Sequence, residues 1–412
     1  MKINLSSLLL YLIPLSLCLG SIPLTGELSV STLKTSDQIF QERVAANNHV
    51  GITEQLTGLA LWGFIYFIAF LLAIKIFNLY KESNRKIYTL FAFLTLPGIF
   101  SLFITQNFLG TLTLSVHLIG TALIGLCSAH LFIHHRDKFI GSIQFIIIIF
   151  LIFHLMFSFI MPEYSFSYKG RLQGMTNNPN SLARIALIAI IITFAARKIR
   201  HTRILNFSTI FLSSVVLYMT ESVTAIVCAI IAWILFFIFA RFSFMSRNLN
   251  AVSFLIILIS PLLMFLITLV FESFLAISSR DSTLTGRTLI WGSALELISL
   301  KPIFGWGFAN LEGAFEQASL AVTSYHNGYL DILVKGGLTA LLFLVTMLIT
   351  CFNRLKRVSL FDQPFCIIIM MTFMIYNITE STIYTPKNGL WIIFCFILFY
   401  VNLYQIKHQK NS

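Results

Sequence analysis

Apolar runs long enough to cross a lipid bilayer recur along the whole of this 412-residue chain. A transmembrane helix needs about 20 consecutive, mainly apolar residues, and these runs leave no stretch of sequence for a separate soluble domain. Only 11% of the residues are charged, against roughly 25% in an ordinary soluble domain. The sequence therefore predicts an all-α integral membrane protein with a single polytopic domain over residues 1–412.

The apolar runs predict about twelve transmembrane helices. We place them at 5–24, 56–79, 87–105, 111–132, 139–161, 180–196, 204–220, 222–242, 251–271, 329–352, 365–384 and 389–404. The first run follows Lys2 as in a signal peptide, but it is long and lacks a small-residue cleavage pattern, so we interpret it as a helix. The six cysteines lie singly in apolar runs, without CxxC spacing, which predicts small buried hydrophobic residues.

Basic residues fall in every second loop between these runs, which is the positive-inside pattern. These loops hold Lys81, Arg85, Lys86, Arg136, Lys138, Arg197, Lys198, Arg200, Arg203, Arg241, Arg247, Arg354, Lys356, Arg357, Lys407 and Lys410. Together with an even number of spans, the pattern predicts that both termini are cytoplasmic. The net charge of +12 then reports orientation in a membrane, and we expect no nucleic-acid partner.

Three long loops fall on the outer side of the predicted membrane. They are 25–55, 162–179 and 272–328, and the last joins the ninth and tenth spans. Within it, residues 286–300 predict an amphipathic helix, because apolar residues recur at three- to four-residue spacing while Glu296 faces away. Trp291 on this helix would rest at the membrane interface, where indole rings are favoured. Pro302 would end the helix.

Residues 169–181 concentrate polar groups in the loop 162–179. Lys169 and Arg171 precede a helix whose first residues include Asn180, and free amides at a helix N-terminus beside cations favour an anion such as a diphosphate. The segment therefore predicts an outer anion-binding loop. A surface turn with an asparagine helix cap explains the same residues equally well.

Residues 279–288 form a second polar segment, which opens the amphipathic helix. Arg287 would lie in the first turn of that helix, where a cation is unfavourable unless an anion binds there. The misfit favours a functional role for Arg287. Arg280 has two interpretations: it contacts the same anion, or it forms a surface ion pair with Asp281.

Residues 324–329 form a third polar segment, directly before the tenth span. His326 carries an imidazole, which can accept or donate a proton near neutral pH. Tyr325 and Tyr329 would lie in the interfacial aromatic belt or stack on a sugar ring. Three other histidines lie within apolar runs without such neighbours, and we assign them packing roles: His117, His130 and His154.

Charged residues near the outer helix ends leave several pairings open. Arg184, one turn into the sixth span, is costly in hydrocarbon unless it snorkels outward or pairs with a carboxylate. Glu221 and Glu380 lie at outer helix ends, and either would neutralise Arg184 or orient His326. Asp331 and Lys335, one helical turn apart, would pair with each other.

Four motifs in order along the chain resemble the O-antigen ligase and polymerase superfamily. They are Arg171-x-x-Gly174 with Pro179-Asn180, Leu284-Thr285-Gly286-Arg287-Thr288 with Trp291, Pro302 with Gly305-x-Gly307, and His326-Asn327-Gly328-Tyr329. The resemblance covers roughly residues 171–337. Residues 221–224 depart from it, with Glu-Ser-Val-Thr where many relatives carry Ser-Arg.

The resemblance implies a multi-spanning, lipid-sugar-dependent glycosyltransferase at the outer face of a bacterial inner membrane. It implies that Arg171 and Arg287 hold the diphosphate of an undecaprenyl-linked glycan donor, that His326 activates the acceptor hydroxyl, and that these catalytic residues converge on one pocket outside the membrane. Substrate-binding roles fall to residues around them: Lys169, Asn180, Arg184, Arg280, Tyr325 and Asn327. The resemblance implies no metal and no cofactor, and attack opposite the leaving group predicts inversion.

Two reactions fit the resemblance, and they differ only in the acceptor. A polymerase of O-antigen or exopolysaccharide would extend another glycan, whereas an O-antigen ligase would transfer the glycan to lipid A core; the run 284–288 favours polymerisation. A chain-length regulator and a flippase are the expected protein partners. A lipid-glycan flippase or other transporter is the rival from another class, although transport sites lie near the bilayer midplane and these polar groups lie at one surface. A non-catalytic assembly partner would not need the arginines and histidine.

Overall fold

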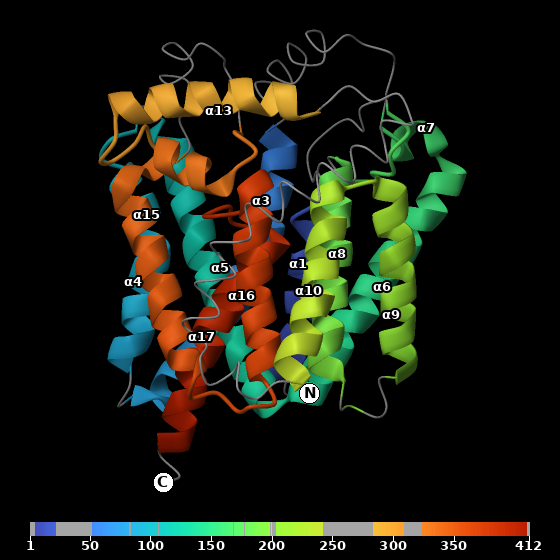
Figure 1. Ribbon diagram of the computed structural model, residues 1–412. Coiled ribbons are helices and arrows are strands. Elements are labelled where there is room, and N and C mark those ends of the chain that lie inside the picture. The colour runs from blue at the N-terminus through green and yellow to red at the C-terminus, as the bar shows by residue number, and fades with distance from the viewer. Residues whose placement is uncertain are drawn as a thin grey trace. The chain divides into compact units, whose positions relative to one another are not determined.

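The computed structural model describes residues 5–21, 52–81, 84–105, 107–167, 169–176, 178–197, 199, 203–241, 283–308 and 324–409. These residues form helices joined by turns (Figure 1). The helices are α1 (Leu5–Leu19), α3 (Ile52–Leu79), α4 (Asn84–Ser101), α5 (Phe108–His134), α6 (Arg136–Ile160), α7 (Pro162–Ser165), α8 (Pro179–Ala196), α9 (Arg203–Thr220), α10 (Val223–Arg241), α13 (Thr283–Leu300), α15 (Gly328–Leu355), α16 (Gln363–Thr379) and α17 (Gly389–Gln409).

Most of the predicted spans correspond to a helix, with shifted ends. The span predicted at 251–271 lies outside the described residues, as does Arg280. Helix α1 ends at Leu19 rather than at residue 24, and α16 ends at Thr379 rather than at residue 384. The second error has a local cause, because the backbone of Glu380 is extended and ends the helix there. Each of the six cysteines is a buried free thiol, as predicted.

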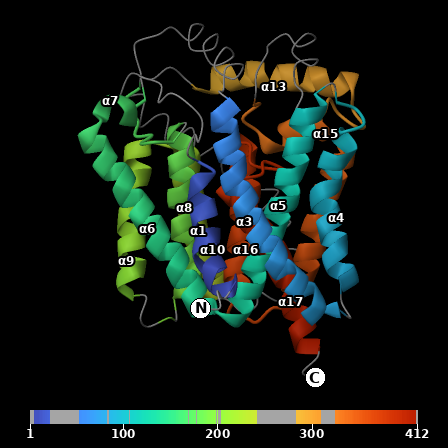
Figure 2. The ribbon, with the colours of Figure 1, turned by 180° about the vertical axis from the view of Figure 1, so that it is seen from behind.

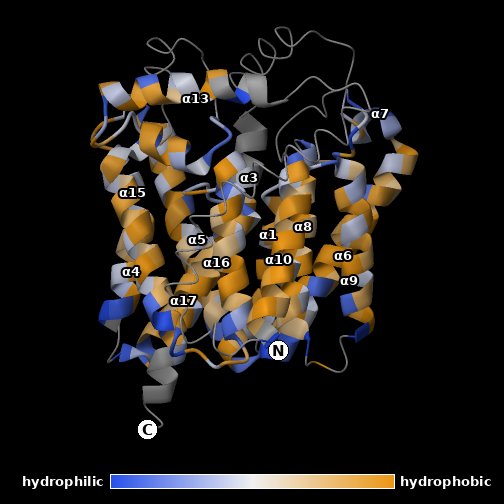
Figure 3. Ribbon diagram, in the orientation of Figure 1, coloured by the Kyte–Doolittle hydropathy of each residue, from blue (hydrophilic) through white to orange (hydrophobic). Residues whose placement is uncertain are grey.

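Six of the described helices are long and apolar enough to cross a membrane: Ala60–Leu79, Phe108–His134, Arg136–Ile160, Pro179–Ala196, Arg203–Thr220 and Gly328–Leu355. Shorter apolar helices, including α16 and α17, accompany them. Figure 3 shows hydrophobic residues along the lengths of these helices and hydrophilic residues near many of their ends. The chain is therefore a multi-pass membrane protein, and the number of twelve spans and their orientation stay predictions.

The described chain divides into two compact units, and each is described by itself. The first comprises residues 1–72 and 134–226, where α8 packs against α6 and α9, and α1 packs against α6. Nearly every side chain of α8 is buried. Across α6 and α9 the amide of Gln144 donates to Asn206 Oδ1 at 2.5 Å, which satisfies polar groups that lipid would leave unpaired. The prediction of one polytopic domain over the whole chain stays a prediction.

The second unit comprises residues 73–133 and 227–412. Helix α15 packs against α4, α13, α16 and α17, and aromatic rings fill the space between α16 and α17, where Phe373 stacks on Phe394 at 4.1 Å between centroids. Helix α13 lies crosswise at one end of this helix group, while the chain terminus after α17 lies at the other end (Figures 1 and 2). The amphipathic helix of the sequence thus covers one end of α15.

Helix α15 is broken at Gly337, a feature that the apolar run did not indicate. The backbone of Gly337 has a φ of 62°, and that of Gly305 in the preceding loop has a φ of 69°, values that glycine adopts readily. Trp306 N–H donates to Val334 O and Gly307 N–H to Lys335 O, both at 2.8 Å, and Leu338 N–H donates to Pro302 O at 2.9 Å. The loop therefore satisfies peptide groups that the break releases, as backbone in a membrane protein requires.

The approach of the loop to α15 leaves no room for side chains at either glycine. A Cβ atom at Gly305 would lie 2.6 Å from Lys335 O, and one at Gly337 would meet the Ile303 carbonyl even more closely. The loop holding the predicted Gly305-x-Gly307 turn is thus docked on the helix that follows His326.

Candidate functional site

His326 lies in a turn that is held by the start of α15. Asn327 is the N-cap of α15, and its Oδ1 accepts from Tyr329 N–H at 3.0 Å and Leu330 N–H at 3.1 Å, as cap asparagines do. His326 itself has a φ of 49°, a left-handed conformation that is uncommon for residues other than glycine, although asparagine, aspartate and histidine adopt it more often than the rest. Its side chain is 46% exposed, so the turn presents the imidazole at an open surface.

Tyr325, directly before His326, is held at both of its peptide hydrogen-bonding groups. Its N–H donates to Asp331 Oδ1 at 2.8 Å, and its carbonyl accepts from the indole N–H of Trp291 at 3.0 Å. Asp331 also pairs with Lys335 at 3.4 Å, as the sequence predicted. Sequence reasoning missed both bonds to Tyr325, because neither the residue spacing nor the composition indicates them.

The side chain of Tyr325 is buried, which argues against its predicted role in stacking on a sugar. It is 0% exposed and packs in a cluster with Ala294, Leu297, Trp306 and Val334. Burial, and secondarily the charge of Asp331, raises the pKa of Tyr325 to about 12. The ring therefore anchors the turn through its packing in this cluster, and the hydroxyl stays protonated at neutral pH.

Replacing Tyr325 with phenylalanine is expected to leave stability unchanged or to raise it by about 1 kcal/mol. The hydroxyl of Tyr325 is buried and has no hydrogen-bond partner among the described residues, so its removal ends a desolvation cost without breaking a bond. Thermal unfolding of the purified protein in detergent measures the effect. Tyr325→Ala is the matched control, and it should cost about 3–5 kcal/mol because it removes the whole ring. A lower melting temperature for Tyr325→Phe would show that the hydroxyl has a partner.

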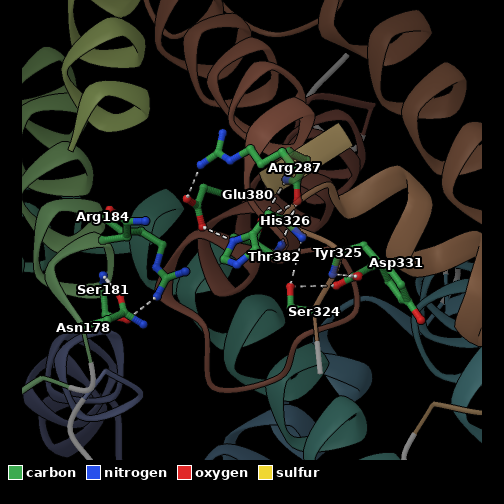
Figure 4. A network of polar contacts seen from close by, with 12 residues as sticks. Asn178, Ser181, Arg184, Arg287, Ser324, Tyr325, His326, Asp331, Glu380 and Thr382 are labelled. Carbon is green, nitrogen blue, oxygen red and sulfur yellow. Dashed lines mark hydrogen bonds and ion pairs between the residues drawn. The ribbon is translucent and has the colours of Figure 1, made fainter. Parts of the chain in front are cut away.

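A carboxylate from the end of α16 joins His326 to Arg287. Glu380 Oε2 lies 3.9 Å from His326 Nδ1, and Glu380 Oε1 lies 3.7 Å from Arg287 Nη2 (Figure 4). The carbonyl of Glu380 also accepts from Gly328 N–H at 3.1 Å, which ties the end of α16 to the start of α15. Of the two carboxylates left open by the sequence, Glu380 is thus the one that faces His326.

The burial of Glu380 determines how strongly it depends on the two basic side chains beside it. The side chain of Glu380 is 10% exposed and that of Arg287 is 26% exposed. A carboxylate so far removed from water is stable as an anion only beside cations or hydrogen-bond donors, and Arg287 supplies one cation. His326 on the other side would gain the same carboxylate as a partner whenever its ring is protonated.

Helix α13 begins earlier than the sequence suggested, and this changes the argument for Arg287. The helix starts at Thr283 rather than at residue 286, so Arg287 lies in the second turn and not in the first. The repulsion between a cation and the helix dipole falls off within the first turn, and Glu380 supplies the negative charge. The predicted faces of the helix are confirmed at three positions: Ala294 and Leu297 are buried and Glu296 is exposed.

In the first unit, Arg171 joins its own loop to the end of α9. Its Nε donates to Thr220 O at 2.8 Å and its Nη2 to Asn180 Oδ1 at 2.9 Å, while Leu172 N–H donates to Met219 O at 2.9 Å. Carbonyls at a helix C-terminus carry partial negative charge and attract a guanidinium. Arg171 therefore stabilises this loop, and its predicted contact with a donor diphosphate stays a prediction.

Arg184 points back along α8 toward the N-terminus of that helix. Its Nη2 donates to Ser181 Oγ at 3.1 Å, whose own N–H donates to Asn178 Oδ1, the cap of the helix (Figure 4). The Nε of Arg184 is buried without a hydrogen-bond partner in the described part of the chain. The N-terminus of α8 is the end predicted to lie on the outer side, so this direction agrees with the first of the two alternatives, that Arg184 snorkels outward. Lys169 is exposed in the same loop.

The predicted site residues thus form two groups, one in each unit. Arg287, His326 and Asn327 come together with Glu380 in the second unit, while Lys169, Arg171, Asn180 and Arg184 belong to the first. Convergence of Arg171 with the other two catalytic candidates stays a prediction. Within the described residues, no group of three or more His, Cys, Asp and Glu side chains is placed to hold a metal ion.

Two comparisons with known proteins agree with the resemblance of the motifs. Residues 208–345, which include Arg287 and His326, match the O-antigen ligase family model. The exopolysaccharide production protein ExoQ of Rhizobium meliloti is 34% identical over 96 residues, which cover 20% of this chain. That match spans only about a fifth, 22%, of the relative's own length. Over residues 208–345 the chain is therefore similar to the O-antigen ligase family, and over a shorter stretch it is similar to ExoQ.

Proposed function

We propose that this chain is a glycosyltransferase that moves a glycan from undecaprenyl diphosphate to a sugar hydroxyl at the outer face of a bacterial inner membrane. The observation that carries the proposal is the contact of one nearly buried carboxylate, Glu380, with both Arg287 and His326. The arrangement supplies a cation for a diphosphate and a base for a hydroxyl within the same unit. Two of these residues, Arg287 and His326, lie inside the segment that matches the family model.

The base in this proposal is Nε2 of His326, the ring nitrogen that does not face Glu380. Nδ1 faces Glu380, so Nε2 takes the proton from the acceptor hydroxyl while the hydroxyl oxygen attacks the anomeric carbon of the donor. Glu380 stabilises the imidazolium that forms, as a carboxylate behind a catalytic histidine does in other enzymes. The exposure of the imidazole leaves room for a bulky carbohydrate acceptor.

The leaving group in this proposal is undecaprenyl diphosphate. The bond between the anomeric carbon and the diphosphate oxygen breaks as the new glycosidic bond forms, and the electron pair stays on the diphosphate. Arg287 offsets the negative charge that develops there, since a guanidinium placed in advance stabilises such charge where water is scarce. Attack from the face opposite to the leaving group gives inversion at the anomeric carbon.

The first unit holds its own group of cations that could bind a diphosphate. Arg171, Arg184 and Lys169 belong to one segment at the start of α8, and the buried Nε of Arg184 lacks a partner among the described residues. A diphosphate oxygen would supply an acceptor for it. In the second unit, Asn327 acts through the turn, because its side-chain oxygen accepts both hydrogen bonds that cap α15.

Polymerisation is the reaction that we favour over ligation. The name of the matching relative concerns exopolysaccharide production, and this supports transfer from one lipid-linked glycan to another. The description of the family model, O-antigen ligase, supports the alternative, in which lipid A core is the acceptor. Both reactions use the same donor chemistry, so they differ only in what occupies the exposed side of His326.

The experiment that tests the proposal supplies purified protein in nanodiscs with a lipid-linked oligosaccharide donor bearing a fluorescent label. A polymerase lengthens the labelled glycan on its own lipid, and a ligase labels added lipid A core; either result supports a glycosyltransferase and tells the two apart. Movement of the donor across the bilayer without a new glycosidic bond would instead identify a flippase. No product and no movement, with either acceptor and with chain-length regulator added, would identify an assembly partner.

A further inference from the structure

Helix α13 makes two polar contacts around His326, from residues that lie one helical turn apart. Arg287 reaches Glu380 at 3.7 Å, and four residues later Trp291 donates its indole N–H to the carbonyl of Tyr325 at 3.0 Å. Residues four apart lie on the same helix face. The face of α13 that holds the cation therefore also holds the backbone directly before His326.

The conformation of His326 depends on the residue before it. A residue other than glycine in the left-handed region is strained, and the conformation persists only where its surroundings impose it. His326 has that conformation, and Tyr325 is fixed in three ways: by its buried ring, by Asp331 at its N–H and by Trp291 at its carbonyl. Of the two hydrogen bonds, the one from Trp291 comes from α13, the helix that carries Arg287.

We propose that Trp291 is a positioning residue, whose indole N–H fixes the Tyr325–His326 peptide and thereby aims the imidazole between Glu380 and the acceptor. This inference rests on the proposed function, because it assigns Trp291 a role in the same transfer. It replaces the expectation that Trp291 merely anchors α13 at the membrane interface. Trp291 touches neither donor nor acceptor in this scheme.

A positioning role predicts a particular kinetic result. Trp291→Phe keeps a large apolar ring and removes only the N–H donor, so the cations that hold the donor are unchanged. We expect kcat to fall about 10- to 100-fold, the effect of a misdirected catalytic group, while KM for the lipid-linked donor changes little. Steady-state rates of glycan transfer at varied donor concentration measure both quantities.

Trp306, which lies in the cluster that buries the Tyr325 ring, provides a matched control. Its indole N–H donates to Leu297 O at 2.9 Å, a bond of the same type and length that ends on α13 instead of on the His326 turn. Trp306→Phe should therefore keep kcat within a few-fold of the unchanged protein. A similar loss of kcat in both variants would mean that activity depends on either indole hydrogen bond, and not specifically on the one to the His326 turn. That result would overturn the proposal.

A second comparison tests whether Trp291 acts through His326. In a chain that already carries His326→Asn, adding Trp291→Phe should not lower the residual transfer rate further, because there is no imidazole left to aim. A further fall equal to that in the unchanged background would overturn the proposal, as would an increase in KM with an unchanged kcat.

Variants of Asp331 cover the case in which Trp291→Phe does not fold. Asp331→Asn and Asp331→Leu both remove the carboxylate that pairs with Lys335, but only Asn keeps an oxygen that can accept from Tyr325 N–H. If fixing the backbone of Tyr325 aims the imidazole of the next residue, Asp331→Leu lowers kcat far more than Asp331→Asn, and equal values contradict it. Full activity of His326→Asn would point to a different failure, that of the proposed function itself.

Discussion

Replacing His326 with asparagine is expected to lower the rate of glycan transfer by about 10²–10⁴-fold, the contribution of a positioned general base. Asparagine is the informative substitute because it tolerates the left-handed backbone that His326 adopts, so the turn before α15 should survive. Its amide cannot take a proton from a hydroxyl. Transfer of a labelled lipid-linked glycan in nanodiscs measures the loss, and thermal unfolding checks that the variant is folded.

His135 is the matched control for the loss of a histidine. It lies exposed between α5 and α6 and belongs to the first unit, so His135→Asn should transfer glycan at the original rate. His326→Ala is less clean, because alanine has the strain of the left-handed conformation without a favourable side chain. Normal glycan length from a folded His326→Asn protein would exclude His326 as the base.

The helical fold was largely predictable because the bilayer imposes it. A lipid-embedded chain satisfies its peptide groups within helices, so apolar runs such as 111–132 and 139–161 locate α5 and α6 closely. The break in α15 was not predictable, because Gly337 lies in an apolar run of the usual length and its peptide groups are satisfied by residues 302–307. Such a break depends on a tertiary contact rather than on local propensity.

The candidate site was predictable only where it depends on neighbours in sequence. The cap role of an asparagine at the start of a helix and the pairing of Asp331 with Lys335 follow from short spacings. The choice between Glu221 and Glu380 did not, since both carboxylates lie near the outer end of a predicted span. Packing of α16 against α15 decides it, because Gly328 N–H binds the carbonyl of Glu380 and brings its carboxylate to His326.

Replacing Arg287 with alanine is expected to lower the transfer rate by about 10²–10³-fold, the usual effect of removing one group that stabilises developing negative charge. Lysine at this position should recover part of the rate, since it restores the charge but not the planar fork that binds two phosphate oxygens. The same nanodisc assay measures both variants. Lys301 is an exposed cation directly after α13, and its Nζ lies 3.9 Å from the centre of the Trp306 ring. Lys301→Ala should leave the rate unchanged.

Arg287→Ala has two effects that this variant alone does not separate. It removes the cation that stabilises the diphosphate, and it leaves the carboxylate of Glu380 without the Arg287 cation. Glu380→Gln removes that buried charge, so the pair of variants forms a cycle. If Glu380 served only to hold Arg287, adding Glu380→Gln to Arg287→Ala would cost no further rate. We expect an additional fall, because Glu380 also faces His326 Nδ1 at 3.9 Å and its charge stabilises the imidazolium. A double variant as active as Arg287→Ala alone would remove Glu380 from the base and confine it to the donor side.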